Sequence, residues 1–516
     1  MLSVRDLTVY HEKDLRVLMR GVTFTLSGQD RLAVIGEEGD GKSTLLKLIC
    51  APESAAYCTF SGVIAHPGEV LGYLPQEMPP AWRDQPVYAC CGEHKGFTAL
   101  SPKELNALCA RLQLSSELCY SDQPFGRLSG GEKVKLQLLL ALACHPTMLV
   151  LDEPSNDLDL PALRFLEKFI CACGLPVLYI SHDETLLSRT ATRILHFEMA
   201  HHKREPRWTL ANVPYERYME ERGRALEKQE QLAQMERRKE RAQQQRFQRI
   251  QQAVEHAQAT VSRQDPSTGR LLKKKMKAVK SLEHRFEREK REQTERPNIE
   301  MAMDASFTGD HSLPAGKRII DVSLPVLSVQ GRVLARGIEL TLIGSEKVLL
   351  IGENGCGKTT LMRLIAEQAA RQTALCPLYI PQRYEEELPE AITPIEYLHT
   401  AGDKEQLTRL RTCLGAFHFT REEMARPIGR LSGGQKSKLL WAKAVLSDTR
   451  LLLLDEPTRN LSPLSAPVVR RMMCDFQGAV LTVTHDRTLM RMWPGRILRL
   501  TGEGLITLKP EEIAAL

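Results

Sequence analysis

Gly36-Glu37-Glu38-Gly39-Asp40-Gly41-Lys42-Ser43 is the stretch that decides the fold, and a second stretch has the same spacing: Gly352-Glu353-Asn354-Gly355-Cys356-Gly357-Lys358-Thr359. Each follows a short apolar run and precedes a helix-like segment, which is the context of a phosphate-binding loop. Glycines at these positions let backbone N–H groups converge on phosphate oxygens, with a helix N-terminus behind them. The sequence therefore predicts two such loops.

Further motifs follow both loops in the same order. Leu128-Ser129-Gly130-Gly131 is matched by Leu431-Ser432-Gly433-Gly434, and Asp152-Glu153-Pro154 by Asp455-Glu456-Pro457. His182 and His485 come last. The offset is 303 positions for Ser129 and Ser432, for Asp152 and Asp455, and for His182 and His485. This shared register indicates that one nucleotide-binding unit occurs twice.

Apolar runs alternate with helix-like segments in both halves of the chain. The runs at 148–151 and 451–454 each end at an acidic pair, and the runs at 177–180 and 479–483 each precede a histidine motif. This alternation predicts an α/β fold with a mostly parallel sheet in each half. Ligand-binding residues then lie at the carboxyl ends of the strands. We expect a first cassette at residues 1–200 and a second at residues 300–516.

The composition adds constraints on the class of protein. A chain of 516 residues is too long for one core. Its 13 cysteines show no metal-ligand spacing or disulfide framework, which is typical of a reducing cytosol. The N-terminus lacks the apolar run of a signal peptide, and no stretch reaches the ~18–20 apolar residues of a membrane span. The apolar run at 136–143 is expected to be a buried helix. We expect a cytoplasmic protein without a membrane span.

The expected chemistry is that of Mg²⁺-dependent ATP binding. Lys42 and Lys358 are expected to reach the β and γ phosphates. The expected Mg²⁺ ligands are the hydroxyls beside these lysines, the aspartates that end apolar strands, and two glutamines in similar Pro-Gln contexts: Ser43, Gln76, Asp152, Thr359, Gln382 and Asp455. Alone, either glutamine would more often be an ordinary surface residue.

The residues after the aspartates suit catalysis. Glu153 and Glu456 are candidates for the general base that orients the attacking water. His182 and His485 are candidates for a contact with the γ-phosphate, although a single histidine at such a place would more often be structural.

The nucleotide contacts expected in the first half, with Tyr10 as a candidate to stack on adenine, are Tyr10, Gly36, Gly39, Gly41, Lys42, Ser43, Thr44, Gln76, Ser129, Gly130 and Gly131. Those expected in the second half are Gly352, Asn354, Gly355, Gly357, Lys358, Thr359, Thr360, Gln382, Ser432, Gly433 and Gly434.

The Leu-Ser-Gly-Gly stretches, followed by Glu132 or Gln435, resemble the signature sequence of ATP-binding cassette (ABC) ATPases. The resemblance implies that two cassettes pack head to tail, with ATP between the phosphate loop of one and the signature of the other. Lys42 would then face Ser432, and Lys358 would face Ser129. Because both cassettes are on one chain, no obligate oligomer is expected.

The segment at 201–299 is charged and has apolar residues at helical seam spacing, which predicts a long antiparallel α-helical hairpin joining the two P-loop ATPase domains. Its expected tip near 265–270 contains Asp265-Pro266-Ser267-Thr268-Gly269, a turn signal. Residues 263–291 hold eleven Lys or Arg against four Asp or Glu. Such a charged run usually forms a solvated helix face, but the excess of positive charge favours binding to RNA.

The complete layout resembles the ABC-F subfamily: two cassettes, no membrane domain and a charged hairpin between them. Members of that subfamily bind the ribosome at the tRNA exit site; some act in translation generally and others protect ribosomes from antibiotics. The resemblance implies ribosomal RNA and tRNA as partners, contacted by Lys273, Lys274, Lys275, Lys277 and Lys280. The short spacing between glutamine and signature mildly favours the protection branch.

The two halves also differ from each other. Glu38 and Asp40 in the first loop correspond to Asn354 and Cys356 in the second, and they add negative charge near the expected phosphates. Ser462 stands where the subfamily pattern has an aspartate, which questions communication between the sites. We therefore expect two unequal ATP sites.

Two other classes of protein remain as alternatives. The ATPase subunit of a membrane transporter can also fuse two cassettes, but it needs no long basic hairpin. A DNA-linked ATPase would have its coiled coil inside one cassette, between phosphate loop and signature, whereas both cassettes here are uninterrupted.

Overall fold

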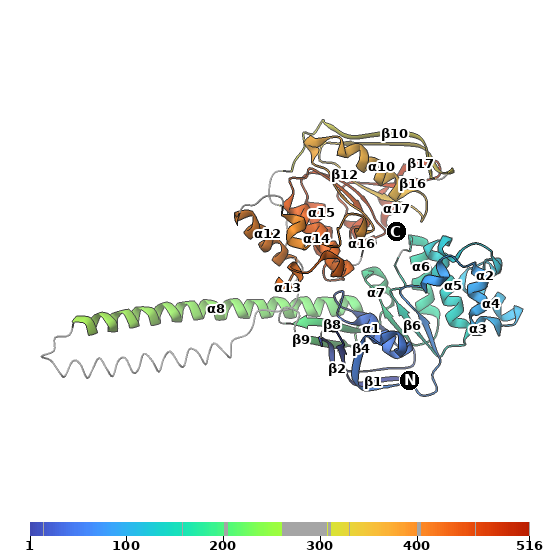
Figure 1. Cartoon of the computed structure of the whole chain (residues 1–516), viewed down its shortest axis with the longest axis horizontal. Coiled ribbons are helices and arrows are strands. Elements are labelled where there is room, and N and C mark those ends of the chain that lie inside the picture. Colours follow the sequence, from blue (N-terminus) through green and yellow to red (C-terminus); the bar gives the residue numbers. More distant parts are fainter. Residues whose placement is uncertain are drawn as a thin grey trace. The chain divides into compact units, whose positions relative to one another are not determined.

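The computed structural model describes residues 1–13, 15–156, 158–200, 205–260, 307, 311–329, 331–399, 404–459 and 461–514. The chain divides into two compact units, one of Met1–Tyr215 with Glu300–Leu516 and the other of Glu216–Ile299 (Figure 1). The basic stretch at 263–291, with its lysines and the second helix of the expected hairpin, lies outside the described residues.

The first cassette is built on a six-stranded sheet, as far as its described residues show, in the order β5-β6-β7-β3-β8-β9. Its strands are β3 (Arg31–Ile35), β5 (Leu71–Leu74), β6 (Met148–Asp152), β7 (Val177–Ile180), β8 (Arg193–Ala200) and β9 (Glu205–Ala211). All neighbours pair in parallel except β8 and β9. The predicted parallel core is therefore confirmed, and β9 carries the sheet past residue 200.

A separate antiparallel sheet in the order β2-β1-β4 was not expected from the apolar runs. Its strands are β1 (Leu2–His11), β2 (Val17–Leu26) and β4 (Cys58–Ala65). Buried residues alternate with exposed ones along much of β2, as in a sheet with one face on a core. The helices of this cassette are α1 (Lys42–Cys50), α2 (Val87–Glu93), α3 (Lys95–Thr98), α4 (Pro102–Leu112), α5 (Gly130–Ala143), α6 (Leu160–Ala172) and α7 (Glu184–Thr190).

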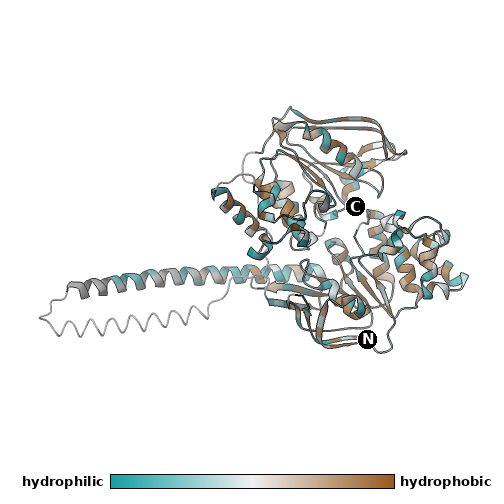
Figure 2. Ribbon diagram, viewed as in Figure 1, coloured by the Kyte–Doolittle hydropathy of each residue, from teal (hydrophilic) through white to brown (hydrophobic). Residues whose placement is uncertain are grey.

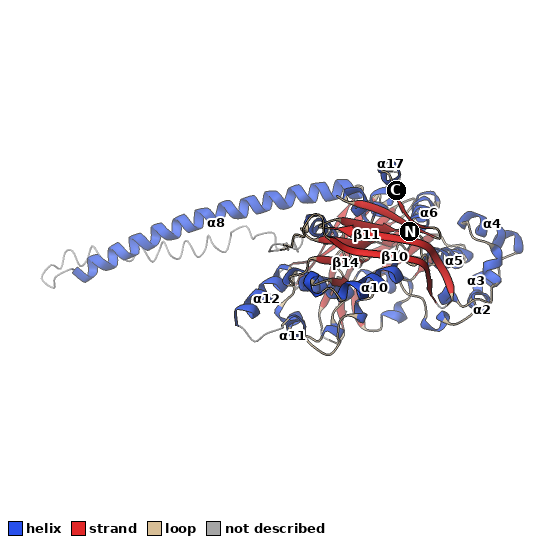
Figure 3. Cartoon of the chain, turned by 90° about the horizontal axis from the view of Figure 1, so that it is seen from above, coloured by secondary structure: helices blue, strands red, loops and turns tan. Residues whose placement is uncertain are grey.

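The second cassette repeats this plan. Its sheet has the order β13-β14-β15-β12-β16-β17, beside an antiparallel pair of β10 and β11. The strands are β10 (Arg318–Val329), β11 (Arg332–Ile343), β12 (Lys347–Ile351), β13 (Leu378–Ile380), β14 (Leu451–Asp455), β15 (Ala479–Val483), β16 (Arg496–Thr501) and β17 (Gly504–Thr507). The strands of both cassettes are red in Figure 3.

The helices of the second cassette also correspond to those of the first. They are α10 (Lys358–Ala370), α11 (Pro394–Leu398), α12 (Lys404–Ala416), α13 (Arg421–Met424), α14 (Gly433–Leu446), α15 (Ala466–Asp475), α16 (Arg487–Met492) and α17 (Pro510–Ala514). The central strands are buried throughout: β6, β7, β14 and β15 have no exposed residue. Helix α5 is buried from Leu138 to Ala143, as its apolar run predicted.

Helix α8 (Tyr215–Thr260) begins the segment between the cassettes. Its 46 residues correspond to a rod of about 69 Å at 1.5 Å per residue. The coloured part of α8 is mostly teal in Figure 2, in contrast to the brown strands of the cassettes. Among the described residues, no helix is long and apolar enough to cross a membrane.

Candidate functional site

The two glycine loops have the backbone geometry that their sequences predict. Gly41 and Gly357, the residues before the loop lysines, have φ of 86° and 104°, which a side chain rarely adopts. They are the N-cap residues of α1 and α10, and neither helix has a side-chain cap. The first N–H groups of both helices are therefore left for a ligand, which fits a phosphate.

Both loop lysines lie inside their loops. The Nζ atom of Lys42 donates to the carbonyls of Gly36 at 3.0 Å and Glu37 at 2.8 Å. The Nζ atom of Lys358 donates to the matching carbonyls of Gly352 and Glu353, both at 2.8 Å. Each ammonium is thus held directly beside the N-terminus that would receive a phosphate.

Each of the two aspartates ends a strand of its own sheet, Asp152 at β6 and Asp455 at β14. The Oγ atom of Ser43 donates to Asp152 Oδ1 at 3.1 Å. Burial, then the neighbouring Glu153, raises the pKa of Asp152 to about 6; burial likewise raises that of Asp455. Among the described residues, Oδ2 of Asp152 and both carboxylate oxygens of Asp455 are buried without a hydrogen-bond partner. Orphaned carboxylate oxygens beside a hydroxyl fit a hard cation such as Mg²⁺.

The glutamates that follow the aspartates have an unusual backbone conformation. Glu153 and Glu456 have φ of 49° and 52°, in the left-handed region. Glu153 Oε1 lies 3.2 Å from His182 Nε2, and Asn156 donates to Glu153 at 2.6 Å. Burial raises the pKa of Glu153, but the charge and hydrogen bond of His182 outweigh burial and lower it to about 2. This carboxylate is ionised and oriented.

The corresponding group in the second cassette is in a different state. Glu456 Oε1 lies 3.7 Å from His485 Nε2. Burial, then Asp455, raises the pKa of Glu456 to about 8. Burial, then Lys358, lowers that of His485 to about 3. Both groups are therefore neutral near pH 7, and their contact is not an ion pair.

The two glutamines lie at the same sheet edge as the aspartates. Leu74, two residues before Gln76, pairs with Leu151, and Ile380, two residues before Gln382, pairs with Leu454. Gln76 is exposed and Gln382 is half-buried.

Among the other candidates, Thr44 bonds the Tyr57 hydroxyl at 3.1 Å, whereas Thr360 is half-buried. Tyr10 is 37% exposed and pairs with Val17 of β2, the strand that also packs Leu18 against Gly41.

The signature serines begin long helices. Ser129 is the N-cap of α5 and forms a capping box with Glu132; Ser432 is the N-cap of α14 and forms one with Gln435. The signature glycines Gly130, Gly131, Gly433 and Gly434 are the first residues of these helices. The capping box uses the N–H groups of the serine and of the third helical residue, so the N–H groups of the two signature glycines are the ones that an anion can reach.

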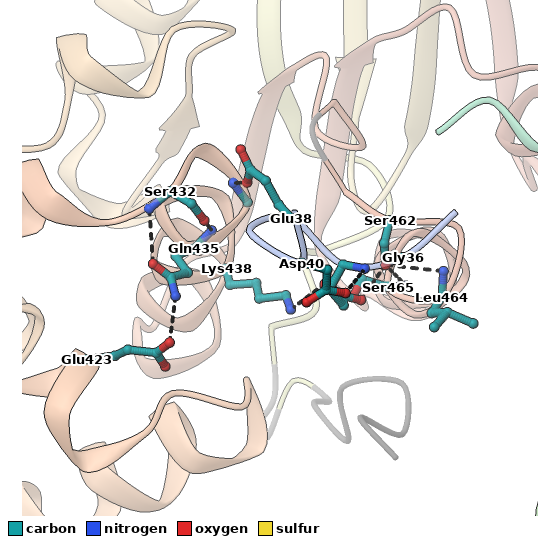
Figure 4. Close-up of polar contacts among 12 residues, drawn as sticks. Gly36, Glu38, Asp40, Glu423, Ser432, Gln435, Lys438, Ser462, Leu464 and Ser465 are labelled. Atoms are coloured by element: carbon teal, nitrogen blue, oxygen red, sulfur yellow. Dashed lines mark hydrogen bonds and ion pairs between the residues drawn. The ribbon is translucent and has the colours of Figure 1, made fainter. Parts of the chain in front are cut away.

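The structure brings the first loop to the second signature (Figure 4). Glu38 accepts a hydrogen bond from the N–H of Gly434. Glu37 accepts from Lys438 at 3.0 Å and from Ser465 at 2.8 Å, and also from Ser462. We call Glu37, Glu38, Gly434, Lys438, Ser462 and Ser465 the first composite site. Its two carboxylates, both from the first cassette, contact α14 and the residues just before α15.

The second loop has different neighbours. The N–H of Asn354 donates to Asp159 Oδ2 at 3.4 Å. Beside the first signature lies a cavity of about 550 Å³ whose lining includes Ser129, Lys135, Asp159 and Phe165. Asp159 and Ser462 occupy equivalent places, 303 positions apart, and both reach the loop of the other cassette. Ser462, which stands where an aspartate was expected, therefore still makes a contact between the cassettes. We call Asn354, Asp159 and the residues that line this cavity the second composite site.

Sequence reasoning missed the residues that join the cassettes. Glu37, Lys438 and Ser465 carry no motif that marks them as functional. One signal was present: Lys438 follows the second signature and Glu37 lies in the first loop, which the head-to-tail arrangement places together. Their pairing across 401 positions could be seen only in the structure.

Duplicated parallel sheets, uncapped glycine-loop helices and capped signature helices define a tandem ATP-binding cassette protein. A family model described as "ABC transporter" matches residues 19–156, 335–376 and 377–459. "Probable ATP-binding protein YheS" of Escherichia coli K12 is 27% identical over 517 residues, covering 93% of this chain and 76% of that protein. "ABC transporter F family member 2" of Arabidopsis thaliana is 27% identical over 416 residues, covering 78% and 57%.

A solved structure has the same fold. The archaeal ribosome recycling factor aABCE1, in complex with the ribosomal stalk protein aP1, aligns with a TM-score of 0.58 and 17% identity, covering 99% of this chain and 92% of that one. The chain belongs to the ABC family, in its ABC-F subfamily of tandem cassettes. It binds ATP and is an ATP hydrolase.

Proposed function

We propose that this chain is a cytoplasmic, ATP-driven factor that acts on the ribosome. The observation that carries the proposal is the 46-residue charged helix α8, placed between two cassettes that contact each other directly. The cassettes contact each other through their own residues, and we assign to the charged segment that begins with α8 the binding of a partner. Structures of similar fold include a ribosome recycling factor, and YheS and the plant F-family protein share the tandem layout.

Within this proposal, each ATP lies between the loop of one cassette and the signature of the other. Lys42 pairs with Ser432 and Lys358 with Ser129, so that the signature N–H groups meet the γ-phosphate. Asp152 and Asp455 hold Mg²⁺ together with the loop hydroxyls and glutamines, and the ion, when bound, neutralises phosphate charge. Glu153 orients the attacking water at one site and Glu456 occupies the equivalent place at the other, and His182 and His485 contact the γ-phosphate.

ATP binding then joins the cassettes and hydrolysis releases them. The basic residues after the expected hairpin tip, Lys273 to Lys280, neutralise phosphates of ribosomal RNA and tRNA, which gives salt-sensitive binding. Within this function, protection from an antibiotic and a general role in translation are both compatible with the chain.

The test is a pull-down of the Glu153→Gln/Glu456→Gln variant with ATP. A chain that binds ATP but does not hydrolyse it should remain on ribosomes, whereas the same variant carrying Lys42→Ala and Lys358→Ala should not. A further variant with glutamine at all five lysines from Lys273 to Lys280 should dissociate at lower salt than its parent. Absence of ATP-dependent ribosome retention would overturn the proposal.

The transporter alternative makes the opposite prediction in the same experiment. Recovery of the trapped variant with a membrane complex, and not with ribosomes, would assign the chain to a transporter. If ribosome trapping succeeds, the growth of cells with and without the protein on a panel of ribosome-targeting antibiotics separates protection from a general translation role.

A further inference from the structure

The two cassettes have opposite charges at two equivalent positions on the surfaces where they meet. Glu167 of α6 corresponds to Arg470 of α15, and Glu184 of α7 corresponds to Arg487 of α16, both 303 positions apart. The neighbouring N-cap residues, Asp183 and Asp486, are the same in both halves. The charge reversal is therefore confined to the Glu and Arg positions.

The reversed charges pair across the cassettes. Arg470 Nη1 lies 2.8 Å from Glu184 Oε1, and its Nε lies 2.6 Å from Asp486. Arg487 pairs with Glu167 and, at 3.1 Å, with Asp183. The side chains of Arg470 and Arg487 are 5% and 1% exposed. The pairs Arg470–Glu184 and Arg487–Glu167 join the α6 or α15 position of one cassette to the α7 or α16 position of the other, whereas Asp486 pairs with Arg470 within the second cassette.

This geometry makes pairing of like cassettes unfavourable. Two copies of the first cassette in the same arrangement would place Glu167 against Glu184, with Asp183 beside them. Two copies of the second would place Arg470 against Arg487. Glu167 would keep its ion pair with Arg189 and Arg470 its ion pair with Asp486, both within their own cassettes. The like charges brought into contact would still reject the wrong partner.

We infer that Glu167 and Glu184 form a selective face whose partner is the arginine-bearing cassette of the same chain, and that this face rejects a second copy of the first cassette. The face is formed by ion pairs among residues of α6, α7, α15 and α16, and it contains no residue of the glycine loops or signatures. It therefore sets which cassettes can meet, while the ATP sites set when they close.

The first test exchanges charges within the full-length chain. Arg470→Glu places a carboxylate against Glu184, and we expect it to lower ATP hydrolysis at least about tenfold and to reduce the sedimentation coefficient. Glu184→Arg should do the same. The combination Glu184→Arg/Arg470→Glu restores opposite charges across the cassettes and should recover part of both losses, since a glutamate at position 470 still faces Asp486. Arg471→Glu, an exposed neighbour with the same charge change, is the matched control and should behave as the parent chain.

The second test asks whether partner choice itself follows the charges. A chain with Glu167→Arg/Glu184→Arg has arginines on both cassettes, and a chain with Arg470→Glu/Arg487→Glu has glutamates on both. Each alone should lack paired cassettes. A mixture should form a two-chain complex in sedimentation velocity, because each cassette then finds an oppositely charged partner on the other chain.

The outcomes decide the inference. Circular dichroism and thermal unfolding identify variants that fail to fold, and for those the in-chain exchange remains the test. The inference is overturned if Glu184→Arg/Arg470→Glu is no better than its single variants, or if the folded two-substitution chains sediment like the parent and do not associate when mixed.

Discussion

The two composite sites are built from the same motifs, yet different side chains join the cassettes at each. At the first, Glu37 and Glu38 of the loop contact Lys438, Ser465 and the start of α14. At the second, the corresponding residues are Glu353, which is exposed, and Asn354, whose N–H contacts Asp159. The first site is joined by carboxylates, and the second borders a cavity.

This difference shows how the two cassettes can contact each other at the first composite site when no nucleotide is bound. The carboxylate of Glu38 lies on the N–H of Gly434, at the helix N-terminus that would otherwise bind a phosphate. A nucleotide entering the first site must therefore compete with a group of the same charge sign. The second loop is neutral at this position and offers no such competitor.

The largest expected difference concerns hydrolysis. At saturating ATP, Glu153→Gln should reduce turnover about 10²-fold and Glu456→Gln less than about twofold, because Glu153 is ionised and oriented whereas Glu456 is protonated near pH 7. Steady-state phosphate release measures both. Equal losses would break the comparison, since they would make the sites catalytically equivalent.

The next difference concerns stability. Lys438→Met removes the cation beside Glu37, and we expect it to lower the free energy of unfolding by about 3 kcal/mol, because a buried carboxylate then lacks its partner. Chemical denaturation followed by circular dichroism gives the value. Lys135→Met is the matched control: Lys135 occupies the equivalent place, 4.6 Å from the Phe165 ring, and its loss should cost less. A larger loss at Lys135 would reverse the comparison.

Nucleotide affinity should show a smaller effect. Glu38→Asn copies the second loop into the first and should tighten binding of ATP about fivefold without changing turnover, because one like charge is removed. Isothermal titration in a Lys358→Ala background isolates the first site. The mirror change, Asn354→Glu in a Lys42→Ala background, should weaken binding; if both changes leave affinity unaltered, the carboxylates do not compete with phosphate.

The smallest effect is a dependence on pH. Burial raises the pKa of Glu37, but Lys438 and the hydroxyls of Ser462 and Ser465 outweigh burial and lower it to about 2. A carboxyl with a lowered pKa stabilises the folded chain above its unfolded pKa and loses that contribution as the pH falls. The stability difference between the parent and Glu37→Gln should thus shrink by about 0.7 kcal/mol between pH 5 and 4.

Most of the fold could be predicted from local patterns. The runs before Asp152 and Asp455 form the strands β6 and β14, and the serines before the signature glycines form N-caps, because apolar periodicity and capping act over a few residues. The antiparallel sheet of β1, β2 and β4 was not predicted, although the alternation of buried and exposed residues along β2 is a local pattern that differs from the continuous apolar runs of the central strands.

The contacts between cassettes required the structure. Glu37 and Lys438 are 401 positions apart, and no short-range pattern links them. The charge reversal at Glu167 and Arg470 left a trace in the sequence, because superposing the halves at the common offset shows opposite charges there. These opposite charges can be interpreted only once the structure shows that the two surfaces are in contact.

The left-handed backbone at Glu153 and Glu456 has a consequence for the stability of the chain. A side chain held at a positive φ costs on the order of 1–3 kcal/mol, and glycine would relieve that cost. At both positions the residue that is present is therefore not the one that makes the chain most stable. Replacement of either glutamate by glycine is therefore expected to raise the stability of the fold while removing a carboxyl group from the site, so stability and chemistry make opposite demands on the same backbone position.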